Sequence, residues 1–178
     1  MTVMEAIEKR RSIRVYEDAP VPREQLETFL EAMRLAPSWK DMQCWQVIVL
    51  SDREQIMRLG ELLGHNPRRE GVFDKVPYFI AVLADPAQSG DEEGKSYYMT
   101  DIGIALENAC LAATEMGLGT CWIGWFDEQP IKQFLSVPDQ LRLVALTPLG
   151  VPAQDPKPRP RKAMADFVYD GVYGKPLL

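Results

Sequence analysis

The sequence has 178 residues, of which 46% are hydrophobic, and this is enough apolar material for the core of one ordinary globular domain, residues 1–178. A formal net charge of −6 argues against a nucleic-acid-binding or anionic-membrane-binding protein, because both need a broad basic face. The longest apolar runs, such as Tyr78 to Ala84, are too short to span a bilayer. Since the N-terminus also lacks a signal pattern, we expect a cytoplasmic protein with a small anionic ligand.

Cysteine and histidine are few and scattered. Cys44, Cys110 and Cys121 form no CxxC pair, and His65 is the only histidine of the sequence. This disfavours a disulfide framework and a zinc site. His65 stands in a Gly-His-Asn-Pro stretch typical of a loop, which disfavours a Ser-His-Asp or Cys-His system. We therefore expect no metal and no catalytic side chain, with the chemistry supplied by a cofactor.

The predicted elements mix helices and strands. In chain order, apolar spacing predicts helices over residues 2–10, 22–35, 53–63, 97–116 and 127–135, and strands over 46–50, 76–84, 120–126 and 141–149. Thr2 is the candidate N-cap of the first helix. We expect a surface loop over 88–95, an extended proline-rich segment over 153–162 and an edge strand over 167–173. The helix over 97–116 is apolar on most of its circumference, so it lies either at the centre of the domain or against a second subunit.

A basic run follows the first helix. Lys9 to Arg14 hold four cations and a hydroxyl within six residues. If the chain runs extended here, alternation places Arg10, Ser12 and Arg14 on one side and Ile13 and Val15 on the other. Two guanidiniums and a hydroxyl suit the oxygens of a phosphate. The alternative is a solvated basic face that complements the C-terminal dipole of the helix.

The stretch from Ala36 to Trp45 has no usable periodicity, yet it carries Ser, Asp, Gln and two Trp between a helix and a strand. Ligand contacts concentrate in loops held between rigid elements. A hydroxyl and an amide here can bind the edge of a flat heterocycle while a Trp covers its face. The alternative is a plain connector whose tryptophans fill the core.

These two motifs together resemble the nitroreductase family of FMN-dependent NAD(P)H oxidoreductases. Arg10-Arg11-Ser12-Ile13-Arg14 is similar to the family's basic-Ser-x-basic start, and Pro37-Ser38-Trp39-Lys40-Asp41-Met42-Gln43-Cys44-Trp45 to its Pro-Ser-Ser-x-Asn-x-Gln-Pro-Trp loop. Residues 101–126 resemble its central helix followed by a Gly-Leu-Gly-x-x-Trp-Ile-Gly-Gly-Phe strand, and residues 148–152 its Pro-x-Gly-x-Pro ending.

The resemblance implies an α+β fold with a central, mostly antiparallel sheet flanked by helices, and a homodimer with exchanged C-terminal arms. It implies bound FMN, NAD(P)H as the reducing substrate, and nitroaromatics, quinones or a related small molecule as electron acceptor in a ping-pong reaction. A flavin-binding carrier or sensor without turnover is the alternative. Because no GxGxxG follows a predicted strand, NAD(P)H is expected to visit the site without a Rossmann domain.

Carried over residue by residue, the resemblance implies three sets of FMN contacts. The phosphate set is Arg10, Arg11, Ser12 and Arg14 with the returning Arg159 and Arg161; the ring-edge set is Pro37, Ser38, Trp39, Asp41 and Gln43; the set at the reactive edge is Ile123, Gly124 and Trp125. A further amide contact is expected from Asn66 or Arg69. Trp39, Asp41, Cys44 and Trp125 depart from the family pattern, and the two tryptophans are expected to narrow the pocket over the flavin.

Overall fold

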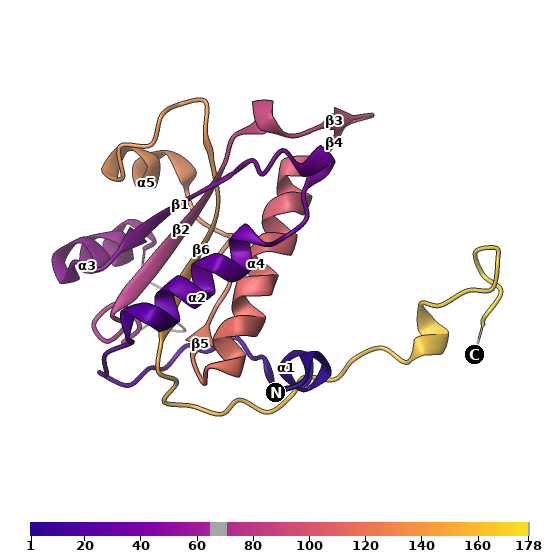
Figure 1. Cartoon of the computed structure of the whole chain (residues 1–178), viewed down its shortest axis with the longest axis horizontal. Helices are drawn as coiled ribbons and strands as arrows, with labels where there is room; N and C mark the ends of the chain where they lie inside the picture. The colour runs from indigo at the N-terminus through magenta and orange to yellow at the C-terminus, as the bar shows by residue number, and fades with distance from the viewer. Residues whose placement is uncertain (65–70, 178) are drawn as a thin grey trace.

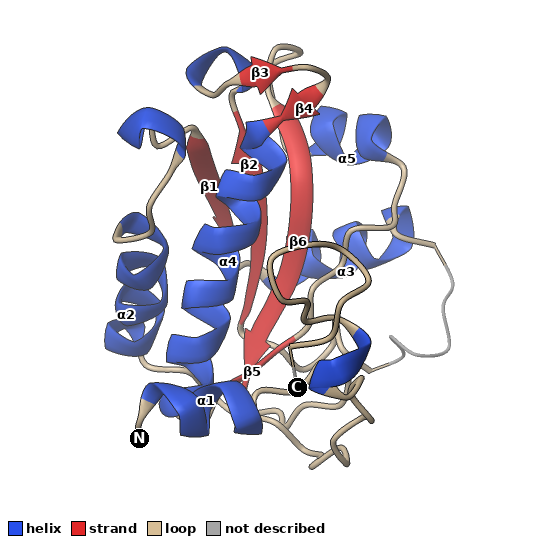
Figure 2. Cartoon of the chain, turned by 90° about the vertical axis from the view of Figure 1, so that its right-hand side faces the viewer, coloured by secondary structure: helices blue, strands red, loops and turns tan. Residues whose placement is uncertain are grey.

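The computed structural model describes residues 1–64 and 71–177. Its centre is a four-stranded antiparallel sheet with the order β1 (Trp45–Leu50), β2 (Tyr78–Ala84), β6 (Arg142–Gly150) and β5 (Gly119–Thr120). One face carries α2 (Arg23–Arg34) and α4 (Tyr97–Glu115), and the other carries α3 (Arg53–Leu62) and α5 (Glu128–Phe134), as Figures 1 and 2 show. The predicted α+β fold with an antiparallel sheet is therefore confirmed.

Side-chain alternation along β2 builds a hydrophobic core on each face of the sheet. Ile80 and Val82 belong to the core beneath α2 and α4, whereas Phe79, Ala81 and Leu83 belong to the core beneath α3 and α5. Successive residues of a strand point to opposite faces, so a strand that is apolar throughout has to be covered on both sides.

The long helix α4 lies at the centre of the domain, in contact with α1, α2 and the sheet. Its residues Ile102, Ala105, Leu106, Ala109 and Ala113 are fully buried within the chain itself. These residues show the expected central position of α4, and contact of its remaining surface with a second subunit stays a prediction. The small side chains on α4 allow close approach of its neighbours.

The N-terminal helix α1 (Val3–Lys9) packs against α4 and begins as predicted. The Thr2 hydroxyl accepts from the Glu5 amide at 3.2 Å, and the Glu5 carboxylate accepts from the Thr2 amide at 2.8 Å. Thr2 is therefore the N-cap of a capping box.

The strand expected over 120–126 is mostly absent. Strand β5 holds Gly119–Thr120 alone, and Ile123 then makes an isolated bridge with Leu146. The ladder is interrupted because the amide of Cys121 donates to the Thr147 hydroxyl, at 3.2 Å, and not to a backbone carbonyl.

One expectation about connecting segments was incomplete and one was wrong. Residues 91–95 are exposed, as expected of a surface loop, but β3 (Asp91–Glu92) and β4 (Lys95–Ser96) pair there around a turn in which Glu93 and Gly94 both have positive φ. The C-terminal residues 167–173 form no edge strand; η4 (Met164–Asp166) is followed by a single bridge between Tyr169 and Pro176. Figure 1 shows that this segment extends away from the body, so no sheet edge of the chain is beside it.

Two further short 3₁₀ helices lie in connecting segments: η1 (Trp39–Asp41) precedes β1 and η3 (Pro86–Gln88) follows β2. The predictions for His65, Asn66 and Arg69 lie outside the described residues. Among the described residues, none of the helices has both the length and the apolar character that a bilayer crossing requires.

Candidate functional site

The basic run after α1 is fixed against the edge of the sheet. Ser12 forms a parallel bridge with Thr120, and the Ile13 amide donates to the Thr120 carbonyl at 2.8 Å. Ile13 is buried, and fully buried Tyr16 donates its hydroxyl proton to the Ile13 carbonyl at 2.9 Å. Glycine at position 119 allows Ile13 to pack beside Thr120, because a Cβ there would lie 2.9 Å from side-chain atoms of Ile13. The turn is thus held by β5 and does not project freely into solvent.

This turn and the proline-rich segment enclose a pocket of about 390 Å³. It is lined by Arg10, Arg11, Ser12, Arg14, Pro156, Lys157, Pro158, Arg159, Pro160 and Arg161. The structure thus brings together all six residues of the predicted phosphate set, although they are about 150 positions apart along the chain, and adds Lys157, which the set did not include. Six cations face one pocket, and the described residues that line it include no acidic side chain. Such a donor set suits a multiply charged oxyanion.

The arginines of the pocket are not equally available to a ligand. Arg11 donates to the Glu8 carbonyl at 2.6 Å and to the Arg10 carbonyl at 2.8 Å, so it caps the end of α1. Arg10 is paired through Nε with Glu107 of α4, at 3.1 Å. Glu107 was not predicted, because nothing in the sequence around it marks it as a partner of Arg10.

The ring-edge set lies in a backbone loop of unusual conformation. Lys40, Asp41 and Gln43 have φ values of 47°, 56° and 52°. Residues other than glycine are uncommon in this region, and each costs of order 1–3 kcal/mol when it is held there. The loop is closed by the Gln43 amide, which donates to the Ser38 hydroxyl at 2.9 Å, and by the Gln43 side chain, which donates to the Asp41 carboxylate at 3.1 Å. Strained loops of this kind cluster at functional sites.

Trp39 connects this loop to the rest of the fold. Its amide donates to Asp101 of α4 at 2.8 Å, and its indole lies against Gly90, where a Cβ would be 2.4 Å from the ring. The Lys40 ammonium lies 4.3 Å from the centre of the same ring. The indole therefore covers the start of the β3–β4 hairpin. Its predicted effect on the width of a flavin pocket stays a prediction.

The third predicted set follows β5. Ile123 is buried and paired with Leu146, whereas Trp125 is 94% exposed. A Cβ at Gly124 would lie 3.0 Å from the indole nitrogen of Trp122, so a larger residue here requires the exposed Trp122 side chain to shift slightly. Neither these residues nor residues 37–43 are among those that line the basic pocket.

Cys44 and Cys110 are not nucleophiles at neutral pH. Burial raises the pKa of the Cys44 thiol to about 11, and the neighbouring Asp101 carboxylate acts in the same direction. Burial likewise raises the pKa of Cys110 to about 11. Since the thiolate is the reactive form, both side chains are inert at pH 7. Across residues 1–64 and 71–177, no three His, Cys, Asp or Glu side chains are grouped as metal ligands would be.

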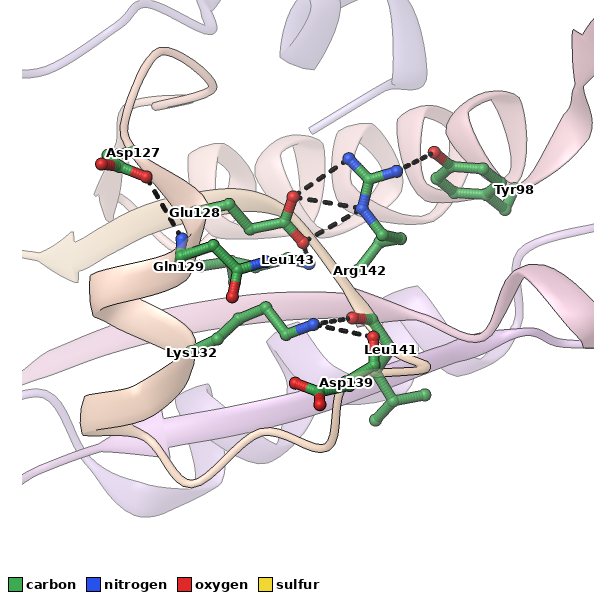
Figure 3. Close-up of polar contacts among 9 residues, drawn as sticks. All are labelled: Tyr98, Asp127, Glu128, Gln129, Lys132, Asp139, Leu141, Arg142 and Leu143. Atoms are coloured by element: carbon green, nitrogen blue, oxygen red, sulfur yellow. Dashed lines mark hydrogen bonds and ion pairs between the residues drawn. The ribbon is translucent and has the colours of Figure 1, made fainter.

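A polar cluster fixes α5 to the start of β6 (Figure 3). The Glu128 carboxylate accepts from Arg142 Nη2 at 3.0 Å and from the Leu143 amide at 2.8 Å. Burial alone raises the Glu128 pKa, but the hydrogen bonds from Arg142 and Leu143 outweigh it, so that the pKa is lowered. Buried Lys132 donates to the carbonyls of Asp139, at 3.0 Å, and Leu141, at 2.5 Å. The charged groups of Glu128, Lys132 and Arg142 each have a partner, so we assign the cluster a structural role.

Comparison with known proteins places this geometry in context. A sequence model of the nitroreductase family matches residues 7–151. The structure is similar to that of a nitroreductase family protein from Clostridium novyi NT, with a TM-score of 0.82 and 36% identity over 99% of this chain and 97% of that chain. The FMN reductase (NAD(P)H) of Bacillus subtilis is 32% identical over 176 residues, 89% of this chain and 69% of the relative. The NADPH-flavin oxidoreductase of Vibrio harveyi is 27% identical over 177 residues, 96% of this chain and 74% of the relative.

Proposed function

Because the chain belongs to the nitroreductase family, we propose that it is an FMN-dependent oxidoreductase that uses NAD(P)H to reduce nitroaromatics, quinones or a related small electron acceptor. The observation that carries this proposal is the basic pocket, in which residues from both ends of the chain present six cations and the Ser12 hydroxyl. The names of the B. subtilis and V. harveyi relatives support the flavin and the nicotinamide.

The residues of the pocket fit the phosphate of FMN. A phosphate monoester carries close to two negative charges at neutral pH and offers three acceptor oxygens. Arg14 and Ser12 are held by β5, and Arg159 and Arg161 approach from the proline-rich segment, so charged donors surround the pocket without rearrangement of the sheet. Arg10 supplies a further guanidinium whose direction is set by Glu107.

The strained loop supplies groups for the flavin ring. When bound, FMN supplies the hydride-accepting and electron-donating centre that amino-acid side chains lack. The protein's part is to orient the ring and shape access to it. The Gln43 backbone amide donates to the Ser38 hydroxyl, and the Gln43 side-chain amide donates to the Asp41 carboxylate. The donors at the ring edge are therefore placed before any ligand binds. Gly124 leaves the backbone after β5 accessible to the ring, and exposed Trp125 is available to contact the acceptor.

The proposed reaction is ping-pong, with the nicotinamide and the acceptor using the same face in turn. Two small molecules that share one site in turn do not need a dedicated dinucleotide domain, and the sequence contains no GxGxxG after a strand.

We further propose that two copies assemble as a homodimer with exchanged C-terminal arms. Phe167, Tyr173 and Leu177 of the arm are 56%, 91% and 55% exposed, and the arm leaves the body of the chain in Figure 1. Apolar side chains at this exposure call for a covering surface. Light scattering after gel filtration tests the assembly; a monomer of about 20.2 kDa would refute it.

The visible spectrum of the purified protein tests the central proposal. We expect a yellow protein, or one that becomes yellow on FMN addition, whose flavin band bleaches on anaerobic mixing with NADH or NADPH and returns when a quinone or nitroaromatic is added. A band that persists with both nucleotides would indicate a flavin carrier or sensor without turnover. A colourless protein that FMN cannot reconstitute would overturn the proposal.

A further inference from the structure

Asp101 is a buried carboxylate with an unusual set of partners. It lies in the first part of α4 and is 2% exposed. Its oxygens accept from the Trp39 amide at 2.8 Å, from the Ser89 hydroxyl at 2.8 Å and from the Cys44 thiol at 3.5 Å. Trp39 and Cys44 lie in the connection between α2 and β1, 62 and 57 residues from Asp101, and Ser89 lies in the connection between β2 and α4, 12 residues from it. Among the ion pairs of the described residues, none involves Asp101.

The contacts of Asp101 bracket the strained loop. Trp39 precedes the three loop residues with positive φ, Lys40, Asp41 and Gln43, and Cys44 follows them. One carboxylate thus binds both ends of a segment whose backbone conformation costs free energy. A conformation of this kind persists only when the surrounding structure over-determines it.

The same carboxylate links the loop to the hairpin region. Ser89 precedes Gly90, on which the Trp39 indole lies, so a hydrogen bond and a ring contact join the two segments side by side. The Tyr97 amide, at the start of α4, donates to the Gly90 carbonyl at 2.9 Å and closes this connection onto the helix.

We propose that Asp101 is a positioning residue: it holds residues 39–44 in the conformation that presents Ser38 and Gln43 to the flavin ring. This inference rests on the proposed function for the identity of the ring. Ser38 and Gln43 cannot hold the loop from outside, because they are part of it. Asp101, on α4, can.

The chemistry of the partners explains why a carboxylate serves here. An amide, a hydroxyl and a thiol all have a proton to donate, and an ionised carboxylate is an acceptor at both oxygens. Asparagine retains one acceptor oxygen but turns an NH₂ group toward one or two of these donors. The Ser89 hydroxyl can rotate to accept from that group, so asparagine preserves part of the arrangement and alanine preserves none.

Hydrogen exchange on the flavin-free protein tests directly whether Asp101 holds residues 39–44 in place. In Asp101→Ala we expect the exchange rates of the Trp39 and Gln43 amides to rise at least about tenfold, with a smaller rise in Asp101→Asn, while amides of α2 and β6 are unchanged. Asp91→Asn is the matched control, because Asp91 lies in the nearby hairpin and its contact is with Ser96. If Asp101→Ala does not fold, Asp101→Asn and Ser89→Ala carry the measurement. Unchanged exchange rates of the Trp39 and Gln43 amides in the variants that fold would overturn the proposal that Asp101 holds this loop.

Binding of FMN and of riboflavin, which lacks the phosphate, tests the positioning role. We expect Asp101→Asn and Asp101→Ala to weaken both flavins by the same factor, about tenfold or 1.4 kcal/mol for alanine, whereas Arg14→Ala weakens FMN alone. Faster exchange with unchanged riboflavin affinity would overturn the positioning role. If the wild type binds neither flavin, the proposed function and the assignment to a flavin ring fail, and the exchange measurement still decides whether Asp101 holds the loop.

Discussion

Replacing Gly119 by alanine should distort the basic pocket, because Gly119 packs against Ile13 on the side of the turn that faces away from the pocket. The new Cβ would lie 2.9 Å from both Cβ and Cγ1 of Ile13, closer than such atoms pack, so Ile13 or β5 has to move. Ile13 is 7% exposed and has little room to retreat. Because Ile13 lies between Ser12 and Arg14, its displacement carries two of the pocket's donors with it.

The expected magnitude follows from two separate effects. Overpacking a filled core costs about 1–3 kcal/mol of unfolding free energy. Loss of good geometry at one charge-assisted hydrogen bond costs about 1.5–3 kcal/mol of FMN binding. Urea unfolding measures the first effect, and titration with FMN measures the second.

Gly103→Ala is the matched control. Gly103 lies within α4, and a Cβ there would have no neighbour within 4 Å. The same substitution at this site should raise helix stability by about 0.5–1 kcal/mol and leave FMN affinity unchanged. The reasoning about the pocket is refuted if Gly119→Ala binds FMN as tightly as Gly103→Ala does.

Three other substitutions probe the charges. Arg14→Ala should weaken FMN binding by about 1.5–3 kcal/mol without affecting riboflavin; equal losses for both would contradict a phosphate contact. Glu107→Gln removes the charge that directs the Arg10 guanidinium and should weaken FMN binding by about 0.2–1 kcal/mol, since the pair is partly exposed; unchanged or tighter FMN binding would show that Arg10 does not need Glu107 for its orientation. Because the pKa of Glu128 is lowered in the folded state, its ionised form stabilises the fold above its unfolded pKa of about 4.3, and this contribution is lost as the pH falls. Urea unfolding of wild type and Glu128→Gln should therefore differ most above about pH 5 and converge on acidification; a pH-independent difference would argue against the ion pair with Arg142.

Local periodicity was sufficient to predict much of the fold. The helix expected over 97–116 is α4 (Tyr97–Glu115), because a long apolar pattern at helical spacing has few alternatives. Thr2 could be identified as a cap because its partner Glu5 is only three residues away. Both features depend on neighbours in the sequence.

Features that depend on distant partners were not predictable in this way. The strand after Gly119 is cut short by the Thr147 hydroxyl, 26 residues from Cys121, and no local pattern announces that contact. The hairpin at Asp91 has strands of two residues, too short for alternation to be visible. Asp101 was not predicted as part of the site, because its contact with Trp39 spans 62 residues and an isolated Asp in an apolar helix carries no motif.

The two carboxylates that the sequence did not single out, Asp101 and Glu107, are both on α4, six residues apart. At about 1.5 Å per residue they are separated by about 9 Å along the helix axis. Asp101 binds the loop with the ring-edge set, and Glu107 binds Arg10 of the phosphate set. Two sets of predicted cofactor contacts, otherwise on separate connections, are therefore tied to one buried helix, whose rigid rise fixes the spacing of their supports. A shift of α4 would move Asp101 and Glu107 together, and with them both sets of contacts. The packing of α4 in the core therefore keeps both sets in place.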